Sequence, residues 1–156
     1  MPESVYIESS IISYLTARQS RDIVVAGIQE LTRDWWGSQR NKYDLFISES
    51  VLREISKGDA GASVKRIQVI SGIPSLIIDQ ESMLLSRSIL KGTNLSQKSI
   101  EDALHIAIAT VNHIEYLLTW NCRHIANAKI IPKVELICHN LGYQCPRICT
   151  PQELMD

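Results

Sequence analysis

The stretch SIEDALHIAIATVNHIEYLLTWN, residues 99–121, decides the fold of this chain. Ser99 stands three positions before Asp102, which is the pattern of a capped helix N-terminus, and apolar residues continue at helical spacing. Residues 116–119 are short, apolar and aromatic-containing, as a buried strand should be. The stretch therefore predicts a capped helix, a turn, and a strand with Asn121 just beyond its carboxyl end.

Two more acids stand at comparable places in the chain. Residues 5–7 form an apolar, β-favouring triplet, and Glu8 follows it directly. Glu54 lies in SESVLREISKG, residues 48–58, where an apolar stripe predicts a helix after the strand at residues 45–47. The carboxyl ends of strands in α/β sheets are where ligands bind. These positions therefore predict a polar site at that edge of the sheet.

Each of these acids also has a purely structural interpretation. Asp102 complements the positive end of the helix dipole, as most acids in a first turn do. One of the two serines after Glu8 is the N-cap of the following helix, with the acid incidental beside it. Glu54 lies on a solvated helix face in this interpretation, and Glu49 competes for its role.

Strand and helix patterns alternate along the rest of the chain. They predict further strands at residues 76–78 and 147–149, a helix ending near residue 16, and helices at residues 21–36, 62–70, 82–91 and 132–141. Gly37, Gly72 and Gly142 are expected to end three of these helices, and TPQE at residues 150–153 predicts a final helical turn. This order is typical of βαβ units, and we expect one domain over residues 1–156.

The composition is that of an ordinary globular protein. Of 156 residues, 45% are hydrophobic and 21% are charged, and the formal net charge is −1. This balance counts against tight, sequence-independent binding of nucleic acid. Basic residues nevertheless cluster in one part of the chain, where a solvated helical surface explains them equally well. They are Arg33, Arg40, Lys42, Arg53, Lys57, Lys65 and Arg66.

The sequence carries no pattern of membrane insertion or export. No apolar run reaches the length of a membrane span, and the amino terminus begins a strand instead of a signal peptide, so we expect a cytoplasmic protein. The four cysteines form no C-x-x-C pair and are expected to be reduced. Cys138 and His139 are adjacent and would face different sides of a helix, so no zinc site is predicted.

The order of these motifs resembles that of the PIN-domain nucleases, and most closely the VapC-like toxins, the ribonuclease half of many bacterial toxin-antitoxin pairs. DALHIAIA at residues 102–109, followed by a strand and TWN at residues 119–121, is the most specific part of this resemblance, which covers nearly the whole chain. The family usually has Asp where this chain has Glu8 and Asn121. Glu keeps the charge on an arm one methylene longer, whereas Asn keeps an oxygen donor and loses the charge.

The resemblance implies a three-layer α/β/α sandwich with a mainly parallel central sheet, whose acids bind Mg²⁺ or Mn²⁺ and a water that cuts RNA phosphodiesters. It implies that Glu8, Glu54, Asp102 and Asn121 are the catalytic residues. Glu8, Asp102 and Glu54 are the implied metal ligands, because hard divalent cations prefer carboxylate oxygen. With no charge at Asn121, we expect one well-held ion instead of two.

Polar residues beside these positions are expected to contact the substrate. They are Ser10, Thr119 and His124. For His124 the alternative is the cap of a short helix. His105 shares the helix face of Asp102, one turn along, but a histidine amid Ala, Leu and Ile more commonly packs in the core.

The resemblance also implies partners. They are an RNA substrate and a cognate antitoxin protein that covers the acidic site or inserts a basic side chain into it. Trp35 and Trp36 offer an apolar anchor for a homodimer. The competing hypothesis, motivated by Glu8 and Asn121, is a catalytically weakened PIN-like domain that binds RNA or a protein partner.

Overall fold

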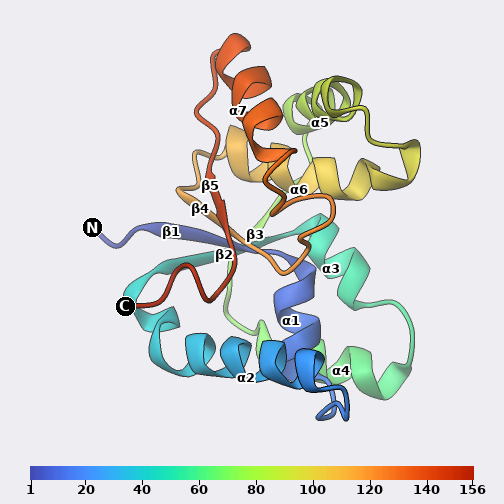
Figure 1. Cartoon of the computed structure of the whole chain (residues 1–156), viewed down its shortest axis with the longest axis vertical. Helices are drawn as coiled ribbons and strands as arrows, with labels where there is room; N and C mark the ends of the chain where they lie inside the picture. Colours follow the sequence, from blue (N-terminus) through green and yellow to red (C-terminus); the bar gives the residue numbers. More distant parts are fainter.

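A single five-stranded sheet organises the computed structural model, which describes all residues from Met1 to Asp156. Its strands all run parallel, in the order β3-β2-β1-β4-β5 (Figure 1). The strands are β1 (Ser4–Ile7), β2 (Asp44–Ser48), β3 (Ser75–Leu76), β4 (Tyr116–Leu118) and β5 (Arg147–Cys149). Because parallel neighbours need crossover connections, helices separate the strands along the chain.

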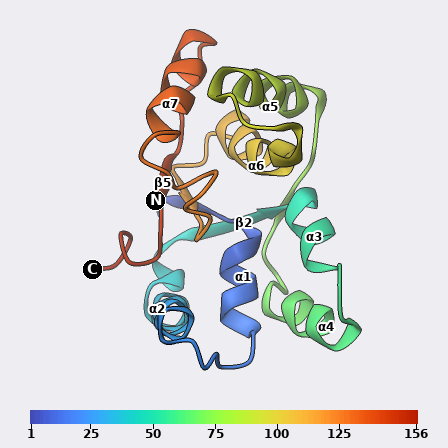
Figure 2. The ribbon, with the colours of Figure 1, turned by 45° about the vertical axis from the view of Figure 1, so that its right-hand side comes forward.

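Helices cover both faces of this sheet, as Figures 1 and 2 show. One face carries α1 (Ser9–Thr16), α2 (Ile23–Ser38) and α4 (Ala60–Val69), and the other carries α5 (Gln80–Thr93), α6 (Ile100–Val111) and α7 (Ile131–Asn140). The remaining helices are α3 (Glu49–Ile55) and the 3₁₀ turns η1 (Arg40–Lys42) and η2 (Gln97–Ser99). The predicted three-layer α/β/α fold with a parallel sheet is confirmed. None of the helices combines the length and apolarity needed to cross a membrane.

The central strand β1 fills the core and sets the alignment of its neighbours. Val5, Tyr6 and Ile7 are fully buried. Ile7 pairs with Leu118 of β4, and Tyr6 pairs with Phe46 of β2. The carboxyl ends of β1, β2 and β4 therefore lie side by side, and the residues that follow these strands meet at one edge of the sheet.

Three predicted element boundaries are wrong. Gly37 lies inside α2, which ends one residue later. The third strand stops at Leu76 because its partner β2 ends at Ser48, which pairs with Leu76, and Ile77 beyond them is 62% exposed. Residues 151–154 form a turn and not a helix, although the Glu153 carboxylate accepts the backbone N–H of the preceding threonine at 3.0 Å, as the TPQE motif predicts.

The predicted cap of the diagnostic helix is also wrong, although the helix itself is confirmed as α6. Ser99 ends the 3₁₀ turn η2 with φ −95° and ψ 14°, so it is not in the extended conformation that an N-cap serine needs. Its hydroxyl accepts no capping hydrogen bond. The 3₁₀ turn leads directly into α6, and Asp102 is therefore free of a capping role with Ser99.

The two tryptophans proposed as a dimer anchor, Trp35 and Trp36, contact other residues of the same chain. Trp35 is fully buried, stacks on Tyr43 with ring centroids 6.0 Å apart, and donates from Nε1 to the Leu154 carbonyl at 3.0 Å. The guanidinium of Arg40 lies 4.3 Å from the centre of the Trp36 ring. Both rings therefore stabilise the packing of α2 against neighbouring segments.

Candidate metal centre

Glu8 directly follows β1 and caps the helix after it. The residue is only 4% exposed. Its Oε2 accepts the Ser10 backbone N–H at 3.2 Å, while Oε1 accepts the hydroxyls of Ser10 and Thr119, both at 2.5 Å. The N-cap of α1 is therefore Glu8 itself and not one of the serines. Donors from α1 and from the end of β4 hold this carboxylate at the edge of the sheet.

Glu54 reaches the same edge from α3. Ser9 Oγ donates to Glu54 Oε1 at 2.8 Å, and His105 Nε2 contacts the same oxygen. The other oxygen accepts no hydrogen bond from the protein, and the side chain is 32% exposed. Burial alone would raise the pKa of Glu54, but the hydrogen bond and charge of His105, together with the Ser9 hydrogen bond and the Lys57 charge, outweigh it and lower the pKa. Glu54 therefore presents an ionised carboxylate with one open oxygen.

The competing acid on α3 points elsewhere. Glu49 Oε2 accepts the backbone N–H of Ile78 at 3.3 Å, beyond the end of β3. This contact ties the start of α3 to the segment after the edge strand. Of the two acids on this helix, the structure thus brings Glu54 to Glu8.

His105 lies between the two acids and is fully buried. Its Nδ1 is 2.7 Å from the Tyr6 hydroxyl, which is in turn 2.7 Å from Ser48 Oγ. Burial lowers the pKa of His105, but the hydrogen bond to Glu54 and the charges of Glu8, Glu54 and Asp102 act in the opposite direction and raise it overall. The histidine is thus a core residue, as expected, but it is also part of the acidic site.

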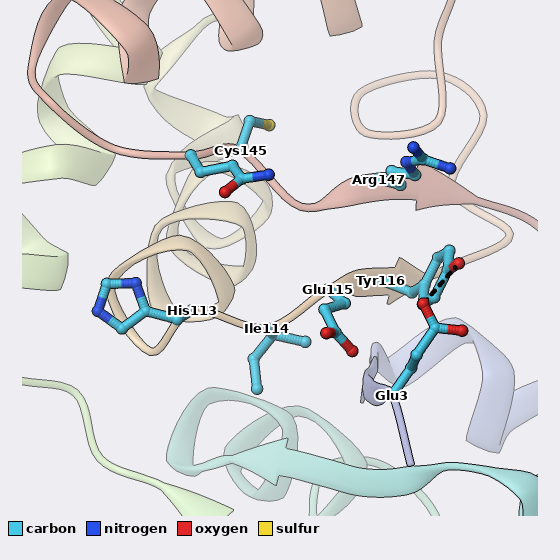
Figure 3. Close-up of a pocket in the computed structure, with 8 residues that line it drawn as sticks. Glu3, His113, Ile114, Glu115, Tyr116, Cys145 and Arg147 are labelled. Atoms are coloured by element: carbon cyan, nitrogen blue, oxygen red, sulfur yellow. Dashed lines mark hydrogen bonds between the residues drawn. The ribbon is translucent and has the colours of Figure 1, made fainter. Parts of the chain in front are cut away.

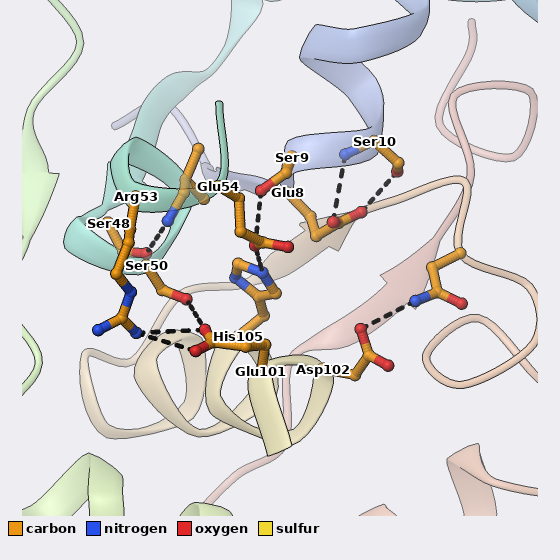
Figure 4. Close-up of polar contacts among 12 residues, drawn as sticks. Glu8, Ser9, Ser10, Ser48, Ser50, Arg53, Glu54, Glu101, Asp102 and His105 are labelled. Carbon is orange, nitrogen blue, oxygen red and sulfur yellow. Dashed lines mark hydrogen bonds and ion pairs between the residues drawn. The ribbon is translucent and has the colours of Figure 1, made fainter. Parts of the chain in front are cut away.

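Glu8, Glu54 and His105 form a compact set of donor atoms (Figure 4). One ligand atom from each lies within 4.8 Å of the other two. Metal–oxygen distances of about 2.1 Å place opposite ligands of an octahedral ion about 4.2 Å apart. The spacing and the carboxylate oxygens therefore fit a divalent cation.

Asp102 belongs to a second, neighbouring cluster. Its Oδ1 accepts from Asn121 Nδ2 at 3.0 Å, and its Oδ2 lies 3.0 Å from His124 Nδ1. The Asn121 side-chain oxygen in turn accepts the His124 backbone N–H at 3.0 Å. Burial raises the pKa of Asp102; His124 lowers it by charge and hydrogen bonding, and the charge of Glu8 raises it, with a net rise. The hydrogen-bonding groups of this second cluster are therefore satisfied by one another. The cluster lies one helical turn from His105.

The acid next to Asp102 has a structural task. Glu101 accepts from Ser50 Oγ at 2.7 Å and from Arg53 Nη2 at 3.1 and 3.2 Å (Figure 4). These contacts join the first turn of α6 to α3. They help to place Glu54 and His105, which come from the same two helices.

The predicted substrate residues have different surroundings. The hydroxyls of Ser10 and Thr119 donate to Glu8, so in the structure they hold this carboxylate. His124 faces Asp102. Contacts of these residues with substrate stay a prediction. His105 is the site residue that sequence reasoning placed in the core, and its spacing of three from Asp102 is the signal that pointed to the site.

A cavity of about 420 Å³ opens beside Glu8 and Glu54. Its other lining residues are Ser9, Ser10, Ser13, Ile55, Lys57 and Arg66. Arg66 Nε and Nη2 donate to the carbonyls of Ile55 and Lys57, at 2.9 and 2.7 Å. The guanidinium is therefore fixed at the carboxyl end of α3, so that two cations from the predicted basic group lie next to the acids.

A second polar pocket, of about 390 Å³, lies at the opposite edge of the sheet (Figure 3). Its acids hold strand ends: Glu3 Oε2 accepts the Tyr116 hydroxyl at 3.1 Å, and Glu115 Oε2 accepts the Ser4 backbone N–H at 2.7 Å. This pocket is at the amino ends of β1 and β4. The groups with metal-ligand geometry are therefore confined to the carboxyl edge.

Comparisons with known proteins agree with this architecture. By sequence, the chain matches no protein-family model and no curated protein. By structure it is similar to VapC20 of Mycobacterium tuberculosis, a sarcin-ricin loop cleaving toxin, with a TM-score of 0.60 and 13% identity over 76% of this chain and 91% of that one. It is also similar to VapBC2 from Rickettsia felis, bound to a DNA fragment from their promoter, with a TM-score of 0.62 and 13% identity over 94% and 98% of the two chains. The fold is therefore of the VapC-like, PIN type.

Proposed function

We propose that this protein is a metal-dependent endoribonuclease that acts as the toxin of a type II toxin-antitoxin pair. The meeting of Glu8, Glu54 and His105 at the carboxyl edge of a VapC-like fold is the observation that carries the proposal. Burying carboxylates is costly unless an opposite charge compensates them. A divalent cation at this edge supplies that charge.

The proposed cofactor is Mg²⁺ or Mn²⁺. When bound, such an ion lowers the pKa of its water and offsets the charge that develops on the phosphate. Glu8 and Glu54 hold the cation in this proposal, and the hydroxyls of Ser10 and Thr119 keep the Glu8 carboxylate in place. Asp102 stays a proposed ligand of the same centre, and Asn121 and His124 orient it.

The proposed substrate is RNA, in keeping with the similarity to VapC20, a sarcin-ricin loop cleaving toxin. The cavity beside the acids supports this substrate class because Lys57 and Arg66 line it together with Glu8 and Glu54. Phosphates bind cations, and hydrolysis needs the metal close to one of them. We place the strand across this cavity, with the scissile phosphate at the acids and a neighbouring phosphate at Lys57.

Cleavage assays test the proposal directly. Purified protein is incubated with a mixed RNA pool in Mg²⁺, in Mn²⁺, and in excess chelator. We expect cleavage with either metal, none with chelator, and none for Glu8→Gln, which keeps the size of the side chain and removes its charge. Metal-independent cleavage, or full activity of a folded Glu8→Gln protein, would contradict the assignment.

An antitoxin is the proposed protein partner. VapBC2 of Rickettsia felis was solved as a complex on promoter DNA, and 94% of this chain aligns with that structure. The partnership is tested by sequencing the genes that flank this one and co-expressing any small flanking gene that encodes a DNA-binding protein, with growth rescue as the expected result. A homodimer stays part of the proposal and is read from the mass of the purified protein in solution.

One observation favours a second function. Both oxygens of Asp102 are bonded to Asn121 and His124, and both oxygens of Glu8 likewise accept hydrogen bonds from the protein. Among the three proposed acidic ligands, only Glu54 keeps an oxygen without a protein hydrogen bond, so less carboxylate is free for a metal than the count of acids suggests. A weakened PIN-like domain that binds RNA or a protein partner follows from this arrangement. Metal-independent RNA binding without cleavage would favour this function over the nuclease.

A further inference from the structure

His105 is placed as a metal ligand would be, although the family resemblance implies only acids. Its Nε2 contacts Glu54 Oε1, and a ring nitrogen of His105 lies within 4.8 Å of one carboxylate oxygen each from Glu8 and Glu54. Resting on the function proposed above, we propose that His105 Nε2 binds the catalytic cation directly. The centre is then a mixed oxygen and nitrogen site that prefers Mn²⁺ to Mg²⁺.

The far side of the imidazole is fixed in the manner of a ligating histidine. Metal-bound histidines usually donate their second ring N–H to a nearby oxygen, which sets the tautomer and the ring orientation. Here the Tyr6 hydroxyl lies 2.7 Å from Nδ1 and 2.7 Å from Ser48 Oγ. When Tyr6 donates to Ser48, its oxygen accepts the Nδ1–H, and Nε2 faces Glu54. A cation that displaces the Nε2 proton, which Glu54 Oε1 accepts in the structure, then finds the Nε2 lone pair directed at the same place as the Glu54 carboxylate.

The hydrogen bonds of Asp102 leave a place in the centre for a nitrogen donor. Glu8 and Glu54 supply two carboxylates, and Asp102 is turned toward Asn121 and His124. The third donor atom of the compact set comes from His105, one turn along α6 from Asp102. Glu54 Oε2, with no protein hydrogen bond, stays open on the solvent side.

This donor set favours one class of ion. Mg²⁺ selects oxygen ligands and near-ideal octahedral geometry, whereas imidazole suits the later first-row ions such as Fe²⁺ and Zn²⁺, and affinity for nitrogen donors rises along that series from Mn²⁺. Mn²⁺ accepts both donor types, so a histidine in the set raises affinity for Mn²⁺ and not for Mg²⁺. The expected signature is therefore a metal preference as well as a coordinated nitrogen.

Pulsed electron paramagnetic resonance of the Mn²⁺-loaded protein tests the ligand itself. We expect nitrogen coupling in the wild type and in His124→Gln, and no coupling in His105→Gln. The matched His124 variant matters because His124 is the histidine of the neighbouring cluster. Absence of coupling in the wild type, or its loss only in His124→Gln, would overturn the proposal. If His105→Gln does not fold, the wild type and His124→Gln still decide between these outcomes.

A second measurement tests whether Tyr6 orients the His105 ring for metal binding. Tyr6→Phe keeps the ring and removes the oxygen beside Nδ1; loss of such an outer partner lowers metal affinity about 10- to 100-fold. We expect this loss in titrations with Mn²⁺ and little change in titrations with Mg²⁺. An equal loss for both ions means that Tyr6 only supports the fold and contradicts the proposed role.

These measurements distinguish failure of the His105 ligand proposal from failure of the proposed nuclease function. Chelator-sensitive RNA cleavage without nitrogen coupling leaves the nuclease standing and removes His105 from the ligand set. Nitrogen coupling in a protein that cleaves no RNA confirms the ligand and contradicts the nuclease. Absence of any bound Mn²⁺ overturns the ligand proposal, and the chelator assay then judges the nuclease by itself.

Discussion

Two polar clusters stand side by side at the carboxyl edge of the sheet, and they differ in how completely they satisfy themselves. Glu8, Glu54 and His105 come from three distant segments and leave Glu54 Oε2 open. In the other cluster, Asn121 and His124 bond both oxygens of Asp102, and the three residues lie within 22 positions of one another. We call the group of Glu8, Glu54 and His105 the open cluster, because Glu54 Oε2 can still bind a cation. We call the group of Asp102, Asn121 and His124 the closed cluster, which is suited to positioning neighbouring groups. The number of carboxylates alone therefore does not identify a metal site.

Among the variants that separate the two clusters, the largest effect is expected for Glu54→Gln, which removes a charge from the open cluster. The amide keeps the bond to Ser9 but removes the charge beside the open oxygen. Removing a residue that only supports a ligand typically lowers metal affinity or activity about 10- to 100-fold. Removing a direct ligand should have a larger effect, so metal-dependent RNA cleavage should fall more than about 100-fold. Single-turnover cleavage at several Mn²⁺ concentrations measures it.

The matched control is Glu49→Gln, on the same helix. Its side chain accepts the Ile78 N–H, and a glutamine oxygen can still do so. We expect wild-type cleavage and an unchanged melting temperature. If Glu49→Gln loses as much activity as Glu54→Gln, the assignment of the acid on α3 is wrong.

Asp102→Asn tests the closed cluster and should have a smaller effect. Asn keeps one acceptor oxygen, so one of the two hydrogen bonds, to Asn121 or to His124, can still form. If Asp102 acts by positioning, cleavage should fall about 10- to 100-fold, within the range for outer-shell groups. Cleavage rates and Mn²⁺ affinity are measured together. A loss as large as that of Glu54→Gln would show that the two clusters share one metal centre.

The sequence predicted the layout of the sheet better than the grouping of the site. Local apolar patterns were enough to place β1 and β5, and the order of motifs pointed to Glu8 and Glu54 at one edge. Such patterns carry no information on contacts between segments far apart, such as the one between His105 and Glu54, 51 positions away. The division of the acids into two clusters depends on which side chain turns toward which partner. Only the folded arrangement decides that choice.

Lys57→Gln tests whether RNA approaches the open cluster through its cavity. Lys57 lines that cavity, and its charge helps to lower the pKa of Glu54. Loss of one phosphate contact should reduce the slope of log affinity against log salt by about 1. Binding of a non-cleavable RNA by the Mn²⁺-free protein, measured across salt concentrations, gives this slope.

Lys65→Gln is the control for that measurement. Lys65 is an exposed lysine of α4 that does not line the cavity. Its removal should leave the slope unchanged, since the two variants lose the same charge and differ only in place. Equal slopes for both variants would mean that RNA binds this surface without a defined path to the acids.

The smallest effect is expected on stability, for a substitution of Ser99 at the N-terminus of α6, the helix that carries Asp102 and His105. Ser99→Ala should change the free energy of unfolding by less than about 0.5 kcal/mol, the low end of the cost of losing a cap, because its hydroxyl makes no capping bond. Asp79→Ala is the positive control: Asp79 Oδ1 accepts the Ser82 N–H at 2.8 Å in a complete capping box, and removing such a cap costs about 1 kcal/mol. Urea denaturation of both variants measures the difference. A Ser99→Ala protein as unstable as Asp79→Ala would mean that Ser99 caps α6 in solution, and that the first turn of this helix, including Asp102, is arranged by its cap.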